Sequence, residues 1–259
     1  MMEVLLKKAS GAEIPCIAEF PEGCSRAVIV IHGFCSSKES SNAVNLFQQL
    51  IPRGIGVIAY DQPGHGSAEA REDELRVPNC LDSLARVEQY VRETLPAAEV
   101  CYFGSSFGAY ILGSYLATRP HAGRRAFLRC AAVNFPELIQ KHPHARPGSA
   151  KRAELAAKGY IDLTLGGTDV IRITEGFLED LEDYDLFRLF EEKKPADVKF
   201  AMAHGAADPT VPVEEAEKFA AQFGYPITVF PGEGHTISED PENPVRVAAL
   251  AAELFTWEG

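Results

Sequence analysis

The pentapeptide Gly104-Ser105-Ser106-Phe107-Gly108 is the stretch that decides the fold. An apolar, strand-like run at residues 100–103 leads into it, and a helix-like run at residues 109–116 leads out of it. A strand, Gly-X-Ser-X-Gly and a helix in succession define a nucleophile elbow, a tight turn that exposes a serine side chain. The residues two before and two after that serine must be small, and both are glycine only around Ser106. The sequence therefore predicts Ser106, and not Ser105, as the nucleophile.

Short apolar runs alternate with helix-like segments on both sides of the elbow. Residues 2–8 and 13–20 predict an antiparallel hairpin at a sheet edge. The strands expected after this hairpin are residues 27–31, 55–60, 100–103, 128–134, 198–203 and 227–230. The expected helices are residues 38–53, 79–95, 109–116, 213–223 and 243–256. Such alternation predicts an α/β fold, a mostly parallel sheet with helices on both faces.

The alternation is interrupted at residues 135–195. Within this stretch, residues 160–165 and 170–174 predict a hairpin. Residues 175–190 predict one or two short helices. Ligands of parallel sheets bind at the carboxyl ends of the strands, and the interruption lies between two strands at that end. We therefore expect residues 135–195 to form an inserted lid on a core of residues 1–134 and 196–259.

A serine hydroxyl needs a general base, and His235 is the best candidate among seven histidines. In sheets that carry such an elbow, the order along the chain is serine, acid, histidine. His235 lies in the glycine-rich sequence Gly232-Glu233-Gly234-His235, after the last expected strand and before the last helix. A glycine-flanked surface histidine with no such role is the weaker reading. The sequence therefore predicts His235 as the base.

His235 follows the last expected strand, at residues 227–230. The acid that orients this base should follow the strand before it, at residues 198–203. Asp208 occupies this place, although an Asx-Pro turn would also explain an Asp-Pro pair. Glu239 and Asp240 are close to His235 but follow it in the chain, so we expect them to cap the last helix. The end of the strand before the lid is another place for the acid, and Asn134 stands there. These positions predict Asp208 as the acid of a triad with Ser106 and His235.

Two backbone N–H groups are expected to bind the oxyanion that forms when a serine attacks a carbonyl. One belongs to Phe107, the residue after the nucleophile, and the other to Phe34, in the loop after the third strand. Gly33 allows this loop to approach the serine. We expect His32 to hold the loop by hydrogen bonds, and Cys35 to have no role.

Composition restricts the partners of the chain. The 259 residues carry a formal net charge of −12, which argues against nucleic acid or an anionic membrane surface as a partner. None of the six cysteines forms a C-x-x-C pair, and several lie in apolar runs, so we expect free thiols in a reducing cytoplasm. No apolar run has the length of a signal peptide or of a membrane span. His142 and His144 have close spacing, but the sequence offers no third ligand, so no metal or cofactor is expected.

Taken together, these motifs resemble the α/β-hydrolase superfamily, and the resemblance covers nearly the whole chain. The stretches that carry it are His32-Gly33-Phe34, Asp61-Gln62-Pro63-Gly64-His65-Gly66, Gly104 to Gly108, His204-Gly205-Ala206-Ala207-Asp208 and Gly234-His235. Within the superfamily, the chain looks most like small bacterial carboxylesterases of the cinnamoyl (feruloyl) esterase type. These share the His-Gly-Phe loop, a lid of similar length and a stretch like Asp162-Leu163-Thr164-Leu165-Gly166-Gly167.

The resemblance implies a function and two further site residues. A lid tyrosine of that family helps to hold the phenolic group of the substrate, and its position corresponds here to Asp169. Glu137 is the nearest acidic candidate for the family's lid aspartate. The expectation is a serine carboxylesterase acting on a small or aromatic ester, with hydroxycinnamoyl esters as one class. An amidase, a thioesterase or an aminopeptidase on the same triad stays open, as does a non-catalytic binding protein. The oligomeric state also stays open, a homodimer being one option.

Overall fold

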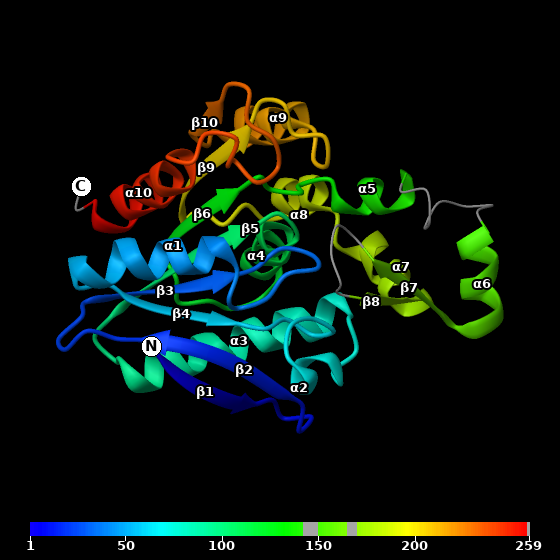
Figure 1. The fold of residues 1–259 in the computed structure, drawn as a ribbon, viewed down its shortest axis with the longest axis horizontal. Coiled ribbons are helices and arrows are strands. Elements are labelled where there is room, and N and C mark those ends of the chain that lie inside the picture. The colour runs from blue at the N-terminus through cyan, green and yellow to red at the C-terminus, as the bar shows by residue number, and fades with distance from the viewer. Residues whose placement is uncertain (142–149, 165–169, 258–259) are drawn as a thin grey trace.

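An eight-stranded sheet forms the centre of the computed structural model, which describes residues 1–141, 150–164 and 170–257 (Figure 1). Its strands are β1 (Met2–Lys7), β2 (Glu13–Glu19), β3 (Arg26–Ile31), β4 (Gly56–Tyr60), β5 (Glu99–Ser105), β6 (Arg125–Arg129), β9 (Lys199–Gly205) and β10 (Ile227–Phe230). Across the sheet their order is β1-β2-β4-β3-β5-β6-β9-β10. β1 and β2 pair antiparallel, as do β2 and β4, and all the other pairs are parallel. The expected edge hairpin and the mostly parallel α/β sheet are therefore confirmed.

Both faces of the sheet are covered, and the alternation within β3 shows how. Ala27, Ile29 and Ile31 point into one apolar layer, whereas Val28 and Val30 point into the other. A strand that is buried on both faces reads as a continuous apolar run, which is why the sequence reveals it. The central strands β3, β4, β5 and β6 thus fix the scaffold, and their carboxyl ends all meet at one edge.

Six helices form the two covering layers. Their bounds are α1 (Ser41–Leu50), α3 (Val77–Thr94), α4 (Phe107–Thr118), α8 (Leu186–Glu192), α9 (Val213–Phe223) and α10 (Asn243–Thr256). Residues of α1 and α10 belong to one apolar layer, and residues of α3, α4, α8 and α9 belong to the other. Figure 1 shows α1 and α10 side by side over the sheet, with the other layer behind them. A short 3-10 turn (Ile51–Arg53) extends α1, and the four-residue α2 (Ala68–Arg71) follows β4.

Several of the expected boundaries differ from the structure by a few residues. α1 begins at Ser41 with Ser40 as its N-cap, because the Ser40 hydroxyl accepts the N–H of Ala43. α3 begins at Val77, two residues before the expected start at residue 79. β6 ends at Arg129, and the apolar residues that follow form a buried loop instead of the expected strand to residue 134. The loop begins at Cys130, whose φ of 42° turns the chain out of the sheet.

The segment between β6 and β9 contains its own small sheet. Its elements are α5 (Phe135–Lys141), α6 (Ala150–Lys158), β7 (Tyr160–Thr164), β8 (Val170–Thr174), α7 (Glu175–Asp183) and α8. The expected hairpin is confirmed by the antiparallel pairing of β7 with β8, and the two expected short helices are α7 and α8. In Figure 1, α6 and the hairpin project to one side of the main sheet. The division of the chain into a core and a lid at residues 135–195 stays a prediction.

Aromatic side chains join this segment to the elbow. Phe135 of α5 and Phe177 of α7 lie 4.8 and 6.3 Å from Phe107, measured between ring centroids. Phe177 is fully buried, so it packs on the main body and does not face an open pocket. Further along, Leu186 of α8 fits over Gly113 of α4. Among the described helices, none is both long and apolar enough to cross a membrane.

Candidate active site

Ser106 occupies the turn between β5 and α4, with φ of 53° and ψ of −116°. This left-handed backbone is strained for a residue with a side chain, and such strain is concentrated at functional sites. The flanking glycines make the turn possible. A Cβ on Gly108 would lie 2.2 Å from the carbonyl oxygen of Ile31, and one on Gly104 would lie 2.7 Å from Cα of Ala109. The two positions tolerate no side chain, as the sequence pattern predicts.

The structure brings His235 to Ser106. His235 lies in the loop between β10 and α10, and its Nε2 is 3.0 Å from Oγ of Ser106. Its Nδ1 is 2.7 Å from Oδ2 of Asp208, so the carboxylate accepts the Nδ1–H. Nε2 is therefore left as the acceptor for the serine hydroxyl. Ser106 and His235 are 129 positions apart in the sequence, so only the fold brings them together.

Asp208 is held on both of its oxygens. Oδ1 accepts the N–H groups of Thr210 and Val211, at 2.8 and 2.9 Å. These contacts form the Asx turn that an Asp-Pro pair suggests, and Oδ2 is left for His235. Burial by itself would raise the pKa of Asp208, but hydrogen bonds from His204 and His235 hold this pKa well below its usual range. The carboxylate is therefore ionised at neutral pH.

In the described part of the chain, two residues with unpaired backbone N–H groups lie near Ser106. Phe107 is the first residue of α4, where the helix dipole favours negative charge. Among the described residues, the N–H groups of Phe34 and Phe107 have no protein acceptor. Gly33 brings its loop within reach, since a Cβ there would lie 3.4 Å from Cβ of Ser106. Both N–H groups can thus receive a negative oxygen at this place.

His32 supports that loop. Its Nδ1–H is donated to the carbonyl oxygen of Gly33 at 2.8 Å, and its Nε2 accepts the N–H of Gln62 at 3.0 Å. Burial lowers the pKa of His32, which keeps the ring neutral and suited to this pair of bonds. The second buried histidine, His65, donates Nδ1–H to Pro63, and burial lowers its pKa to about 3. The contacts of His32 agree with the structural role expected for it.

Sequence reasoning missed two neighbours of Asp208. Nε2 of His204 lies 3.3 Å from Oδ2 of Asp208 and 3.0 Å from the carbonyl oxygen of Val211, to which it donates. The Sγ atom of Cys130 completes a cluster in which the ligand atoms of all three residues lie within 4.8 Å of one another. The signal for His204 was a single histidine in an otherwise apolar strand, four residues before the acid. Nothing local marked Cys130, because its place depends on the turn after β6.

An open groove of about 270 Å³ adjoins Ser106. His235 and Phe34 line it. The rest of its wall is polar and comes mainly from the first turn of α1 and the two loops beside it, with Ser36, Ser40, Ser41, Asn42 and Thr236. Arg129, the last residue of β6, also lines it. The groove is large enough for a small organic group next to the serine.

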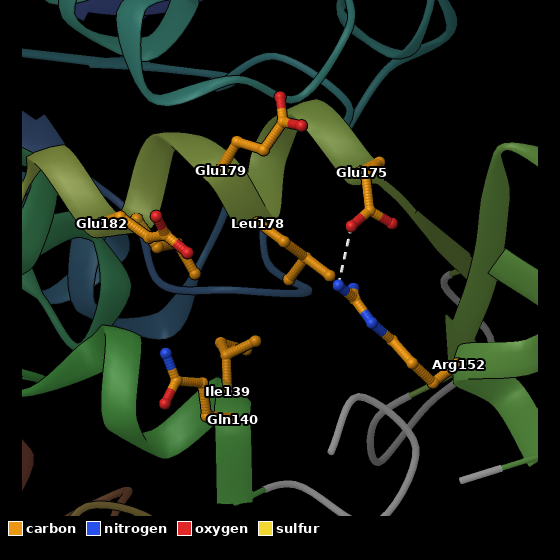
Figure 2. Close-up of a pocket in the computed structure, with 8 residues that line it drawn as sticks. Ile139, Gln140, Arg152, Glu175, Leu178, Glu179 and Glu182 are labelled. Atoms are coloured by element: carbon orange, nitrogen blue, oxygen red, sulfur yellow. Dashed lines mark hydrogen bonds and ion pairs between the residues drawn. The ribbon is translucent and has the colours of Figure 1, made fainter. Parts of the chain in front are cut away.

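A second cavity of similar volume, about 270 Å³, lies inside the segment between β6 and β9 (Figure 2). Ile139 and Gln140 of α5 line one wall, and α7 lines the opposite wall with three glutamates, Glu175, Glu179 and Glu182. Arg152 of α6 reaches across and pairs with Glu175 at 2.6 Å. None of Ser106, Asp208 and His235 lines this cavity, so we place the candidate site at the groove.

The two residues suggested by family resemblance lie elsewhere. Glu137 is on α5, exposed, and pairs with Lys141 one turn further along. Its pKa is lowered, chiefly by the hydrogen bond from Lys141. Asp169 lies outside the described residues, as do His142 and His144. A role of Glu137 or Asp169 in binding substrate stays a prediction.

Comparison with solved structures finds close matches in fold. Est1E from Butyrivibrio proteoclasticus, solved with ferulic acid bound, has a TM-score of 0.80 at 16% identity, covering 99% of this chain and 100% of that one. A provisionally named hydrolase from Agrobacterium vitis S4 also scores 0.80, at 19% identity and 98% coverage of both chains. Mouse alpha/beta hydrolase domain-containing protein 10 scores 0.72 at 18% identity, covering 97% and 98%. At these identities the likeness shows a shared fold.

Comparison of the sequence gives a family. No curated protein matches the chain. The family model described as the alpha/beta hydrolase fold matches residues 26–161, which is more than half of the chain and includes the elbow, the Phe34 loop and the four central strands β3, β4, β5 and β6. With its eight-stranded sheet, its elbow serine and this match, the chain belongs to the α/β-hydrolase family.

Proposed function

We propose that the protein is a serine carboxylesterase, with Ser106 as nucleophile, His235 as general base and Asp208 as the acid that orients it. The observation that carries this proposal is the unbroken hydrogen-bonded chain from Ser106 Oγ through His235 to Asp208, at 3.0 and 2.7 Å. Distances of this size are those over which a proton is transferred between such groups. This series of hydrogen bonds ends at Ser106, whose backbone is strained and which lines an open groove, so the nucleophile is accessible.

The reaction proceeds in two halves. Ser106 Oγ attacks the ester carbonyl while its proton moves to Nε2 of His235, and Asp208 stabilises the resulting imidazolium. The carbonyl oxygen becomes an oxyanion that the N–H groups of Phe34 and Phe107 bind. The carbon–oxygen bond to the alcohol then breaks, and His235 returns the proton to the leaving alcohol. In the second half, His235 takes a proton from water, which attacks the acyl-serine. The bond from the acyl carbon to Oγ then breaks, His235 returns the proton to Oγ of Ser106, and the acid is released.

The substrate class is the finer part of the proposal. Resemblance to feruloyl esterases, together with the fold shared with the ferulate-bound Est1E, makes a hydroxycinnamoyl ester the first aromatic substrate to test. Methyl ferulate compared with short aliphatic esters decides between an aromatic and an aliphatic acyl group. A matched ester and anilide decide between an esterase and an amidase, because amide cleavage requires efficient protonation of a poor leaving group by His235.

The assignment of the nucleophile is tested with two adjacent serines. Ser106→Ala should abolish turnover of a p-nitrophenyl ester and labelling by a fluorophosphonate probe. Ser105→Ala is the matched control, because Ser105 is the last residue of β5 and 4% exposed, and it should still be labelled. Labelling of Ser106→Ala, or its loss in Ser105→Ala alone, would contradict the proposal. An inert binding protein would give no labelling in the wild-type chain.

A further inference from the structure

The guanidinium of Arg129 is a buried positive charge at the edge of the candidate site. Arg129 is 4% exposed and lies at the carboxyl end of β6, where its Cα is paired with Ser105, the neighbour of Ser106. Its NH1 donates to Oγ of Ser105 at 3.0 Å, and its NH2 donates to the carbonyl oxygen of His235 at 2.7 Å. The side chain therefore contacts the residue before the nucleophile and the backbone of the base.

Both of these acceptors are neutral. In the part of the chain that the structure describes, no carboxylate forms an ion pair with Arg129. Arginine remains protonated in proteins, so the charge cannot be removed by releasing the proton. A buried cation without a counter-charge loses its hydration and gains little in return, and for this reason buried charges are almost always paired. The guanidinium of Arg129 therefore lacks a counter-charge among the described residues, although two of its N–H groups donate hydrogen bonds.

The groove has the chemistry of a site for an anion. Arg129 lines it, and none of the other described residues that line it is acidic. The groove is also lined by Ser41 and Asn42 in the first turn of α1, where the helix dipole favours negative charge. Of the five guanidinium N–H groups, two have protein acceptors, which leaves donors for a carboxylate. Arginine and carboxylate form two parallel hydrogen bonds, the strongest such pairing in proteins.

We propose that Arg129 binds a carboxylate on the substrate, so that the enzyme selects esters carrying a negative charge near the scissile bond. The proposal rests on the proposed esterase function. The carboxylate proposal deepens the esterase function, because it gives the groove a specificity for charged esters that the uncharged hydroxycinnamoyl class does not imply. The selection acts at short range, because the net charge of −12 repels anions at a distance. The carboxylate belongs either to the acyl group or to the alcohol.

A purely structural role for Arg129 would be to hold the His235 loop. Loss of such a role would lower the turnover of every ester by the same factor. A binding role would lower the turnover of charged esters more than that of neutral ones. The ratio of kcat/KM for a charged ester to kcat/KM for its neutral analogue therefore separates the two roles, because any damage common to both substrates cancels.

Two substrate pairs locate the carboxylate. For the acyl side, phenyl hydrogen glutarate is compared with phenyl 5-oxohexanoate, in which a methyl ketone replaces the free carboxylate. Spontaneous hydrolysis is subtracted from both rates. For the alcohol side, the acetyl ester of hydroxybenzoate is compared with that of hydroxybenzamide. We expect the wild type to prefer the charged member of one pair by about 10- to 100-fold, the range of a charge-assisted hydrogen bond.

Three variants assign the preference to Arg129. Arg129→Gln should reduce the charged-to-neutral ratio by about tenfold or more, and Arg129→Lys should retain part of it, because the charge stays and the paired geometry is lost. Arg124→Gln is the matched control, since it removes the same charge from an exposed residue just before β6 and should leave the ratio as it is. If Arg129→Gln does not fold, Arg129→Lys carries the assignment to Arg129. Competitive inhibition of the wild type by glutarate and not by glutaramide then tests whether a carboxylate binds at all.

The outcomes are distinct from those of the proposed function. Two results would overturn the proposal. One is a charged-to-neutral ratio of kcat/KM of about one for both pairs in the wild type, and the other is a preference for the charged ester that survives in Arg129→Gln. Hydrolysis of the neutral esters and fluorophosphonate labelling of Ser106 would still stand in that case. Absence of labelling and of all turnover would instead refute the esterase itself.

Discussion

Oδ2 of Asp208 lies 2.7 Å from Nδ1 of His235 and accepts its proton in a hydrogen bond. The same oxygen lies 3.3 Å from Nε2 of the fully buried His204, so one carboxylate oxygen serves two imidazoles. The other oxygen is occupied by the N–H groups of Thr210 and Val211. Asp208 is thus fixed in orientation from every side, and its place leaves His235 a single tautomer in which Nε2 faces the serine.

Replacement of Asp208 by asparagine should abolish this tautomer. The amide oxygen can still accept from Thr210 and Val211, so its nitrogen would face His235 and donate to Nδ1. Nε2 would then carry the proton and could not accept that of Ser106. We expect kcat/KM to fall by about 10⁴-fold with little change in fold, as is typical of this substitution in serine triads.

The measurement is a comparison of p-nitrophenyl ester hydrolysis in Asp208→Asn and Glu239→Gln, with circular dichroism to check the fold. Glu239 is the matched control, because it is the rival acid by proximity in the sequence and its carboxylate accepts from the N–H of Ser238, not from His235. A small loss in Asp208→Asn together with a large loss in Glu239→Gln would refute the assignment of the acid.

Gly108 should be far more sensitive to alanine than Gly113, although both lie on α4. A Cβ at Gly108 would be 2.2 Å from the backbone oxygen of Ile31, and backbone cannot move aside without shifting β3. At Gly113 the nearest atom is the end of the Leu186 side chain, at 3.0 Å, which can change rotamer. We expect Gly108→Ala to cost about 3 kcal/mol or more of the free energy of unfolding, and Gly113→Ala to stay within about 1 kcal/mol. Urea denaturation of both variants checks this, and equal losses would show that the elbow is not as tight as described.

The contrast between these glycines shows which parts of the molecule a sequence reveals. The elbow is local, so two glycines around Ser106 are enough to predict it. His235 and Asp208 follow from their order after buried strands, because the carboxyl ends of parallel strands meet at one edge. Both kinds of inference need only patterns within about ten residues and a count of strands.

The contacts that escaped prediction depend on register across the sheet. Arg129 lies beside Ser105 only because β6 pairs with β5 at this offset. Its NH2 also donates to the carbonyl oxygen of His235, which lies in the loop after β10. Cys130 meets Asp208 because the chain turns out of β6 at a φ of 42°, where an apolar run predicts a strand. Neither pattern is visible locally, since an apolar buried loop has the same composition as a buried strand.

Acid should destabilise the fold through His65. Burial against His32 and aromatic rings lowers the pKa of His65 from 6.5 to about 3 in the folded protein. The unfolded chain therefore binds one more proton than the folded chain between these two values, and stability is lost as the pH falls below about 6.5. Between about pH 7.5 and about pH 5, this one residue should remove about 2 kcal/mol.

Urea denaturation of the wild type and of His65→Gln at these two pH values tests the assignment. The variant loses packing and is less stable at the higher pH, but its stability should fall by about 2 kcal/mol less on acidification. The difference between the two slopes, and not the stability itself, is the quantity to compare. Parallel curves for the two proteins would show that His65 is not the group responsible.

Asp180 of α7 should stabilise α3, which lies more than 100 residues earlier in the chain. The N-cap residue of α3, Arg76, provides no capping side chain for the helix. Asp180 takes over this role, because its Oδ2 accepts the N–H of Val77 at 3.0 Å and its two oxygens pair with Arg76 at 2.7 and 2.6 Å. Asp180→Ala would leave the N–H of Val77 buried without an acceptor. We expect a loss of about 1 to 3 kcal/mol, the range for a lost cap with a partly exposed ion pair.

The position of the loss distinguishes this contact from a general effect of removing a charge. Asp183→Ala is the matched control, because it removes an exposed carboxylate three residues later on α7 and should change the free energy of unfolding by less than about 0.5 kcal/mol. Asp180→Asn should fall between the two, since an amide oxygen can still cap α3 without pairing with Arg76 as an ion. Hydrogen exchange should show faster opening of both α7 and the first turn of α3 in Asp180→Ala, because the contact is mutual. Faster exchange in α7 alone would mean that α3 is capped by other groups and that the segment between β6 and β9 contributes nothing to its stability.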